Sequence, residues 1–232
     1  MKSQMELLAG VPLFKALSES ELKKLAQVMI PRKYGKNEAI LVEDDESANS
    51  MFVIVSGRIR VSVSGVEGRE AILAIMEKGD YFGEMSVIDG EPRSASVRAL
   101  APAELLVLRR EDLLAQIGKN PRLALSMLIE FSRRLRNADG RITSLALLGV
   151  CGRVAGTILD LAKRKGRRVN NMVVIENRPT HQEIAELSGT TRETVSRILS
   201  RLRRSGSLII ERDRIVIPDI KELKHGETAR FD

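Results

Sequence analysis

Apolar and polar positions follow three different spacings along the 232-residue chain. Between residues 5 and 30 the apolar residues recur at helical intervals, and Ser18 with Glu21 three residues later has the sequence of a capping box. Pro31 is expected to end this helical region. The pattern predicts helices that pack against the domain that follows.

From Arg32 to about Arg110 the pattern changes to short alternating strands separated by turn residues. The clearest predicted strands are residues 51–55, 59–63, 71–76, 94–99 and 103–108. Gly35, Gly57 and Gly79 lie 22 residues apart, and we expect each to form a sharp corner with a positive φ. Several short strands at this spacing predict a barrel or jelly roll.

The longest helical pattern runs from Pro121 to about residue 148, after a short predicted helix at 111–117 that should stop at Gly118. Its apolar residues recur with near-heptad spacing at Leu125, Leu128, Leu135, Ile142, Leu145 and Leu148. One long helix with an apolar seam favours a homodimer. The alternative is a helix that packs only on its own sheet domain.

The C-terminal third predicts two helices joined by a tight turn. Thr180 and Glu183 form a second capping box, Gly189 permits the reversal, and Thr191 caps the second helix. The inner side of the first helix consists of Ile184, Ala185 and Leu187, and that of the second of Val195, Ile198, Leu199 and Leu202. This is the pattern of a helix-turn-helix. Residues 208–210 and 214–217 predict a hairpin, the wing of a winged helix.

Charge is distributed unevenly between the two halves. Residues 1–120 carry 16 Lys and Arg against 18 Asp and Glu, a balance of −2, whereas residues 121–232 carry 22 against 13, a balance of +9. A neutral sensor joined to a polyanion-binding module has this signature. The absence of Trp disfavours stacking on single strands, and the single Cys151 excludes a disulfide framework and a cysteine-based metal site. No signal peptide or long apolar run is visible, so we expect a cytoplasmic protein.

The segment 79–95, G-D-Y-F-G-E-M-S-V-I-D-G-E-P-R-S-A, combines a tight turn with one acid and one base. Backbone N–H groups near Gly83 can bind an anion, and the planar guanidinium of Arg93 suits two phosphate oxygens. The carboxylate of Glu84 can accept a hydrogen bond from a sugar hydroxyl. Phosphate and ribose together indicate a nucleotide.

Gly83-Glu84 followed by Pro92-Arg93-Ser94-Ala95 resembles the phosphate-binding cassette of cyclic-nucleotide-binding domains. With the helix-turn-helix, residues 10 to 218 resemble the CRP/FNR (catabolite activator) family of bacterial transcription regulators. The resemblance implies an α+β fold with a jelly-roll sensory domain at 1–120, a dimerisation helix at 121–148 and a winged helix-turn-helix domain at 149–232. The glycine-rich residues 149–152 fall where the family has its hinge, before a helix predicted at 153–165.

The resemblance also implies the site residues. Glu84 is expected at the ribose 2′-hydroxyl, and Arg93 and Ser94 at the cyclic phosphate. The full expected ligand set is Gly83, Glu84, Met85, Ser86, Arg93, Ser94, Ala95, Arg134, Ala138 and Asp139. Where cAMP-binding members of the family place a Thr-Ser pair against adenine, this chain has Ala138-Asp139. A carboxylate fits the adjacent N–H donors of guanine better, so cAMP, cGMP and cyclic di-GMP all stay candidates.

The string Arg192 to Arg197 resembles the family's recognition helix. It implies base contacts by Arg192, Glu193 and Arg197 in TGTGA-like half-sites of a palindromic operator. Phosphate contacts are implied for Thr180, His181, Thr191 and Thr194, and Ser196 lies on the same outer face. RNA polymerase is a further implied partner. The basic run 163–168 is interpreted as a loop that contacts DNA phosphates, RNA polymerase or only solvent.

Other functions fit less well. No nucleophile–base pair or metal-ligand cluster stands out, so we expect neither an enzyme nor a metal site. The family's iron–sulfur sensors use N-terminal cysteines that are absent here, and haem sensors need axial ligands, whereas the two histidines, His181 and His225, lie outside the sensory domain. Two alternatives stay open: a constitutive DNA-binding regulator whose cassette no longer binds a nucleotide, and a nucleotide-regulated protein whose helix-turn-helix contacts only proteins.

Overall fold

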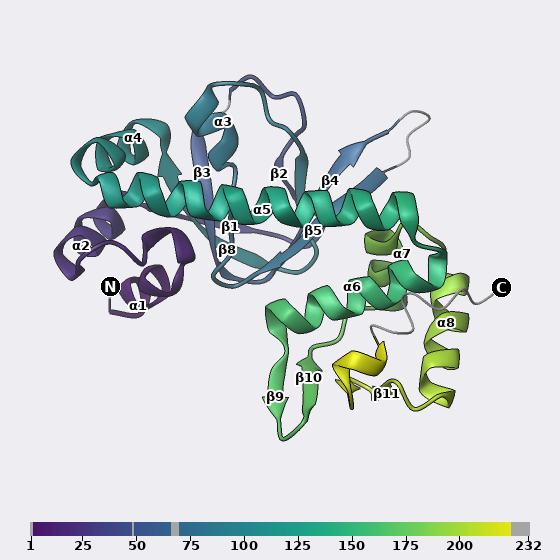
Figure 1. The fold of residues 1–232 in the computed structure, drawn as a ribbon. Helices are drawn as coiled ribbons and strands as arrows, with labels where there is room; N and C mark the ends of the chain where they lie inside the picture. Colours follow the sequence, from purple (N-terminus) through teal and green to yellow (C-terminus); the bar gives the residue numbers. More distant parts are fainter. Residues whose placement is uncertain (1, 48, 66–69, 224–232) are drawn as a thin grey trace. The chain divides into compact units, whose positions relative to one another are not determined.

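The computed structural model describes residues 2–47, 49–65 and 70–223 (Figure 1). The chain divides into two compact units, Met1–Leu135 and Arg136–Asp232.

The helices of the first unit pack against an antiparallel β structure. They are α1 (Lys2–Gly10), the 3₁₀ turn η1 (Pro12–Phe14), α2 (Glu19–Val28), α3 (Glu84–Asp89), α4 (Arg110–Lys119) and the first part of α5 (Pro121–Leu147). The predicted capping box at α2 is confirmed, because the Ser18 side chain accepts from the backbone N–H of Glu21, and the Glu21 carboxylate accepts from that of Ser18. The prediction that Pro31 ends this region was wrong. Helix α2 already ends at Val28, and Pro31 lies in strand β1.

Two four-stranded antiparallel sheets form the jelly roll that the sequence predicted. Their strands are β1 (Ile30–Tyr34), β2 (Ala39–Leu41), β3 (Ser50–Ser56), β4 (Arg58–Ser64), β5 (Glu70–Glu77), β6 (Tyr81–Phe82), β7 (Ser96–Ala99) and β8 (Ala103–Arg109). One sheet has the order β1-β8-β3-β6 and the other β2-β7-β4-β5. Strand β7 begins two residues later than predicted, because its pairing with β4 begins at Ser96.

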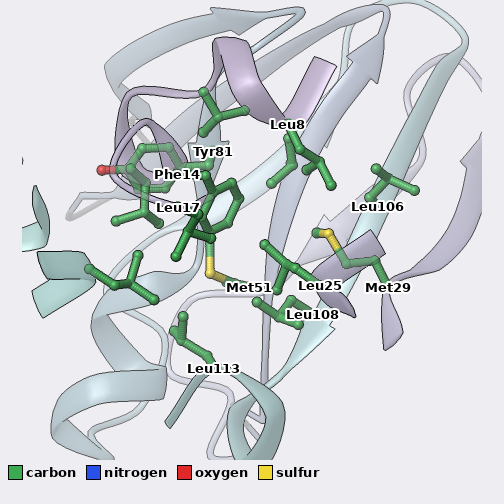
Figure 2. Packing of buried hydrophobic residues seen from close by; sticks show 14 of the residues in the cluster. Leu8, Phe14, Leu17, Leu25, Met29, Met51, Tyr81, Leu106, Leu108 and Leu113 are labelled. Atoms are coloured by element: carbon green, nitrogen blue, oxygen red, sulfur yellow. The ribbon is translucent and has the colours of Figure 1, made fainter. Parts of the chain in front are cut away.

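Two apolar clusters hold this unit together. One contains Phe52, Ile54, Ile59, Phe82, Val97 and Leu105, which come from both sheets, and the Phe52 and Phe82 rings stack with centroids 5.1 Å apart. The other joins the helices to strands β3 and β8, where Leu8, Phe14 and Leu25 meet Met51 and Leu108 (Figure 2). The helices therefore cover apolar side chains of the β1-β8-β3-β6 sheet.

The expected glycine corners are confirmed in part. Gly57 and Gly79 have φ of 96° and 90°, but Gly35 has no positive φ, and Asn37 takes that conformation two residues later with a φ of 66°. The prediction that Gly118 stops the short helix was also wrong. Helix α4 continues through it to Lys119, where the backbone N–H of Asn120 bonds the carbonyls of Gln116 and Ile117.

The second unit contains the end of α5 and a winged helix-turn-helix. Its further elements are α6 (Val150–Lys165), β9 (Arg167–Val169), β10 (Met172–Glu176), α7 (His181–Ser188), α8 (Arg192–Arg204), β11 (Ile209–Ile210) and β12 (Arg214–Ile217), with the sheet order β11-β12-β10-β9. Its core combines α6, α7, α8 and the sheet, with Ile158, Ile184 and Val195 fully buried.

Three local predictions in the second unit need correction. Helix α6 begins at Val150, so Cys151 and Gly152 are helical. The basic run 163–168 is not a loop, because it comprises the last turn of α6, Gly166 and the first two residues of β9. Leu187 is only partly buried, and Ser188 occupies the buried position instead. Among the described helices, none has the length and apolarity needed to cross a membrane.

Candidate ligand site and nucleic-acid interface

The segment singled out in the sequence folds into a turn, a short helix and a returning loop. Gly83 follows strand β6 with φ 80° and ψ 5°, and α3 begins directly after it at Glu84. A Cβ atom at Gly83 would lie 2.9 Å from Arg93 Nη1 and 3.2 Å from the Ser50 carbonyl oxygen. Glycine is therefore required at this position both by the left-handed backbone and by the close approach of Arg93.

Arg93 is buried, with 3% of its surface exposed. Its Nη1 donates to the carbonyl oxygen of Gly83 at 2.9 Å and its Nη2 to that of Ser50 at 2.8 Å, whereas its Nε is buried without a hydrogen-bond partner among the described residues. Burial lowers the pKa of Arg93, and the charges of Asp45 and Glu84 oppose this shift. An anion beside the guanidinium would offset the cost of its desolvation.

Glu84 is the buried acid of the site, with 1% of its surface exposed. Oε1 accepts a hydrogen bond from Arg134 Nη1 at 2.5 Å, and Oε2 is buried without a partner among the described residues. Burial raises the pKa of Glu84, and the charge of Arg134 opposes the shift. The guanidinium of Arg134 also lies 4.6 Å from the centre of the Tyr81 ring, a cation–π contact.

The other predicted ligand residues do not all belong to the same unit. Ser94 Oγ lies 3.9 Å from the sulfur of Met85, which is 49% exposed, and Ser86 Oγ donates to the Pro92 carbonyl oxygen at 3.2 Å. Ala95 is buried beside them in the chain. Residues 83–86, 93–95 and Arg134 thus belong to the first unit. Ala138 and Asp139 are exposed residues of α5 that belong to the second unit.

Sequence reasoning missed three residues around the cassette. The carbonyl oxygen of Ser50 accepts from Arg93, the ring of Tyr81 lies against Arg134, and the guanidinium of Arg110 bonds the carbonyl oxygens of α3. Main-chain acceptors carry no residue-type signal, and Ser50 is 43 positions away from Arg93. Only the two adjacent arginines at 109 and 110 could have drawn attention to the third contact.

Side-chain caps define both helices of the helix-turn-helix. Thr180 Oγ1 accepts from the backbone N–H of Glu183 at 3.2 Å, and Thr191 Oγ1 accepts from that of Thr194 at 3.3 Å. Gly189 makes the turn between the helices with a φ of 61°. These features confirm the predicted caps and turn.

The outer face of α8 is exposed and polar. Arg192, Glu193, Ser196, Arg197 and Ser200 line a shallow hollow of about 490 Å³. His181 begins α7 and is partly buried. Burial and the charges of Arg178 and Arg192 lower the pKa of His181, so cationic groups gather beside the first turn of α7. The face offers bidentate donors and one carboxylate, the groups that distinguish base edges in a major groove.

Comparisons with known proteins support both the ligand-binding domain and the helix-turn-helix domain. Residues 31–120 match the model of the cyclic nucleotide-binding domain, and residues 152–225 that of the Crp-like helix-turn-helix domain. The chain is 36% identical over 197 residues to the cyclic AMP receptor protein of Thermus thermophilus, covering 85% of this chain and 88% of that protein. It is 29% identical over 218 residues to a CRP-like cAMP-activated global transcriptional regulator of Mycobacterium tuberculosis, covering 94% and 97%.

Among solved structures, FixK2 from Bradyrhizobium japonicum superposes with a TM-score of 0.74 at 26% identity, covering 87% of this chain and 98% of that chain. The relative from Mycobacterium tuberculosis is named as a transcriptional regulator, the class of protein that the sequence predicted. With a jelly roll, a long helix and a winged helix-turn-helix in this order, the chain belongs to the CRP/FNR family of transcription regulators.

Proposed function

We propose that a cyclic nucleotide bound in the first unit sets the affinity of this regulator for a palindromic operator. The observation that carries the proposal is the pair of unsatisfied polar atoms in the cassette, Glu84 Oε2 and Arg93 Nε. Both are buried, and a buried polar atom without a partner is costly. One is an acceptor and the other a donor, which suits a ligand with a hydroxyl beside an anionic oxygen.

Different cassette residues bind the ribose and the cyclic phosphate of the nucleotide. Glu84 accepts from the ribose 2′-hydroxyl, and Arg93 and Ser94 donate to the cyclic phosphate. Gly83, Met85, Ser86 and Ala95 shape the main chain around them, and Arg134 holds the carboxylate of Glu84 through the bond of 2.5 Å. A phosphate would exchange the neutral carbonyl acceptors of Arg93 for an anion, and charge-assisted hydrogen bonds are the stronger ones.

The identity of the base rests on Ala138 and Asp139, which are four and five residues beyond Arg134 in the chain. The relatives from Thermus thermophilus and Mycobacterium tuberculosis are named for cyclic AMP, which favours adenine. The carboxylate of Asp139 favours guanine, because its two oxygens can accept from N1–H and N2–H₂ together. We therefore keep cAMP, cGMP and cyclic di-GMP as candidate ligands.

Helix α5 supports a homodimer. Leu125, Leu128, Leu135 and Ile142 are between 58% and 65% exposed, although they are large and apolar. These four residues lie three, seven and seven positions apart, which fits the heptad spacing of a coiled-coil seam. A second copy of the chain covers such a stripe by two-fold symmetry. We accordingly assign residues 1–120 to ligand binding, 121–148 to dimerisation and 149–232 to DNA.

In the dimer, each α8 enters a major groove of double-stranded DNA. Arg192, Glu193 and Arg197 contact base edges of TGTGA-like half-sites, and Ser196 lies beside them. Phosphate contacts come from Thr180, His181, Thr191 and Thr194. Two half-sites lie about 34 Å apart in this docking geometry. Ligand binding favours one arrangement of the DNA-binding units over another, a shift of population. The protein acts where DNA and RNA polymerase are, in the cytoplasm.

Calorimetric titration with cAMP, cGMP and cyclic di-GMP tests the ligand half of the proposal. We expect micromolar or tighter binding of one of them. The Arg93→Gln variant should lose it, because the phosphate loses its bidentate donor. Arg109→Gln is a matched control, since Arg109 is exposed and pairs with Glu111 at 3.6 Å. Failure of the wild type to bind any of the three would refute the proposal.

A further inference from the structure

Arg110 lies outside the cassette in sequence but is hydrogen-bonded to it. It is the first residue of α4, and its Nη1 donates to the carbonyl oxygens of Ser86 and Val87. The contact to Ser86 measures 3.0 Å. Both acceptors belong to α3, the helix that begins with Glu84.

The two bonded carbonyls belong to the part of α3 that needs an external donor. The last four carbonyl oxygens of a helix receive no hydrogen bond from an N–H group of the same helix. Because α3 has only 6 residues, these four include the carbonyls of Ser86 and Val87. The backbone N–H of Gly90 satisfies Ser86 in part, at 3.1 Å, and Arg110 supplies the remaining donor. A cation at this end also complements the helix dipole. Arg110 therefore fixes the carboxyl end of α3 while Glu84 occupies the amino end.

The main chain of Arg110 is tied to the same region. Its N–H donates to the Asn49 carbonyl oxygen at 2.8 Å, and the next carbonyl, that of Ser50, accepts from Arg93 Nη2 at 2.8 Å. The carbonyl of Asn49 thus binds the main chain of Arg110, whose side chain bonds α3. The next carbonyl, that of Ser50, binds the side chain of Arg93, which is proposed to bind phosphate.

We infer that Arg110 is a positioning residue for the cyclic nucleotide: it fixes α3 so that the carboxylate of Glu84 stands at the ribose 2′-hydroxyl, without touching the ligand itself. The inference rests on the proposed function. The inference applies to Arg110 and not to its neighbour Arg109. The side chain of Arg109 pairs with Glu111 and makes no hydrogen bond to α3 among the described residues.

The test uses the full-length protein and four probes: cAMP, cGMP and the 2′-deoxy form of each. In the wild type, the ratio of affinities for a nucleotide and its 2′-deoxy form measures the contact with Glu84. Arg110→Gln should weaken binding of the nucleotide about tenfold, the size of one charge-assisted hydrogen bond, and leave binding of the deoxy form almost unchanged. Arg110→Lys should restore part of the ratio, because an ammonium can still donate to the carbonyls. Arg109→Gln should behave as wild type.

Three results would overturn the inference, each in a different way. Equal binding by the wild type and Arg110→Gln would remove the role of Arg110 while leaving the proposed function intact. An equal loss for the nucleotide and its deoxy form would show that Arg110 supports the fold but does not position Glu84, and circular dichroism of Arg110→Lys would identify this case. A wild type that binds none of the four probes would overturn the inference, and only a failure to bind cyclic di-GMP as well would refute the proposed function.

Discussion

Arg134 on α5 donates to Glu84 on α3 across 50 positions of the chain, with 2.5 Å between Nη1 and Oε1. The pair is asymmetric, because 35% of the Arg134 side chain is exposed but only 2% of that of Glu84. Of the two charged groups, the carboxylate of Glu84 is therefore the more deeply buried. Burial raises the pKa of Glu84 although Arg134 acts in the opposite direction.

This asymmetry predicts that Glu84→Gln does not lower the free energy of unfolding at pH 7. Because the pKa of Glu84 in the folded protein lies above its usual value of 4.5, the folded state binds this proton more tightly than the unfolded state. The carboxyl group therefore lowers stability as the pH rises from 4.5 through the raised pKa. Glutamine removes that pH dependence and should weaken nucleotide binding about tenfold, since a neutral acceptor is poorer.

Urea unfolding at pH 5 and pH 7, with nucleotide titration at pH 7, measures both effects. A lower stability of Glu84→Gln at pH 7 would mean that the ion pair with Arg134 outweighs the cost of burying the carboxylate.

Two glycines with similar positive φ angles allow a matched test of the cassette. Gly83 and Gly79 have φ of 80° and 90°, but a Cβ at Gly79 would meet nothing within 4 Å, whereas one at Gly83 would lie 2.9 Å from Arg93 Nη1. Alanine at either position should cost about 1 kcal/mol in backbone strain. Only Gly83→Ala should also displace Arg93 and reduce nucleotide affinity. Calorimetry measures the nucleotide affinity of both variants. Equal affinities would show that the turn at Gly83 does not contribute to ligand binding.

Much of the scaffold around these residues is predictable from the sequence, and the physical reason is locality. The capping boxes at Ser18 and Thr180 and the turn at Gly189 depend on residues within a few positions of one another, and all three are confirmed. Errors arose where a residue-type rule for helix ends did not decide the structure. Pro31 was predicted to end a helix but lies in β1, where it pairs with Leu106 of β8. Gly118 was predicted to stop a helix but lies within α4, which continues to Lys119.

The hydrogen-bond partners within the candidate site are less predictable. Arg93 bonds the carbonyl of Ser50, and Arg110 the carbonyls of Ser86 and Val87. Main-chain acceptors are the same at every residue, so only the folded jelly roll determines which of them an arginine reaches. The hairpin of β9 and β10 was missed for a related reason, because its basic first strand has the composition of a solvated loop.

The base preference should respond to Asp139. In Asp139→Ser the acceptor pair for guanine N1–H and N2–H₂ is replaced by a hydroxyl, which can accept from the adenine amino group. The ratio of cGMP to cAMP affinity should fall about tenfold, the value of one hydrogen bond to a charged group. Asp139→Asn, which keeps the size and removes the charge, should give an intermediate ratio. A ratio unchanged in both variants would show that Asp139 does not contact the base.

DNA affinity should depend on pH through His181. In the free protein, burial and the charges of Arg178 and Arg192 hold the pKa of His181 below its usual value of 6.5. A DNA phosphate raises that pKa, so binding takes up a proton between the two values. Affinity should therefore fall as the pH rises through this window, by up to about tenfold per pH unit. The slope should vanish in His181→Gln, and an unchanged slope there would place the titrating group elsewhere.

The central claim is that ligand binding in the first unit controls DNA binding by the second. Fluorescence anisotropy of a labelled palindromic duplex with TGTGA-like half-sites, at constant salt, measures it directly. We predict that the nucleotide bound in calorimetry changes the DNA affinity of the wild type and of Arg109→Gln by about tenfold or more, within the usual range of allosteric coupling, and leaves Arg93→Gln unchanged. An identical DNA affinity of the wild type with and without nucleotide would contradict the claim and identify a constitutive DNA-binding regulator.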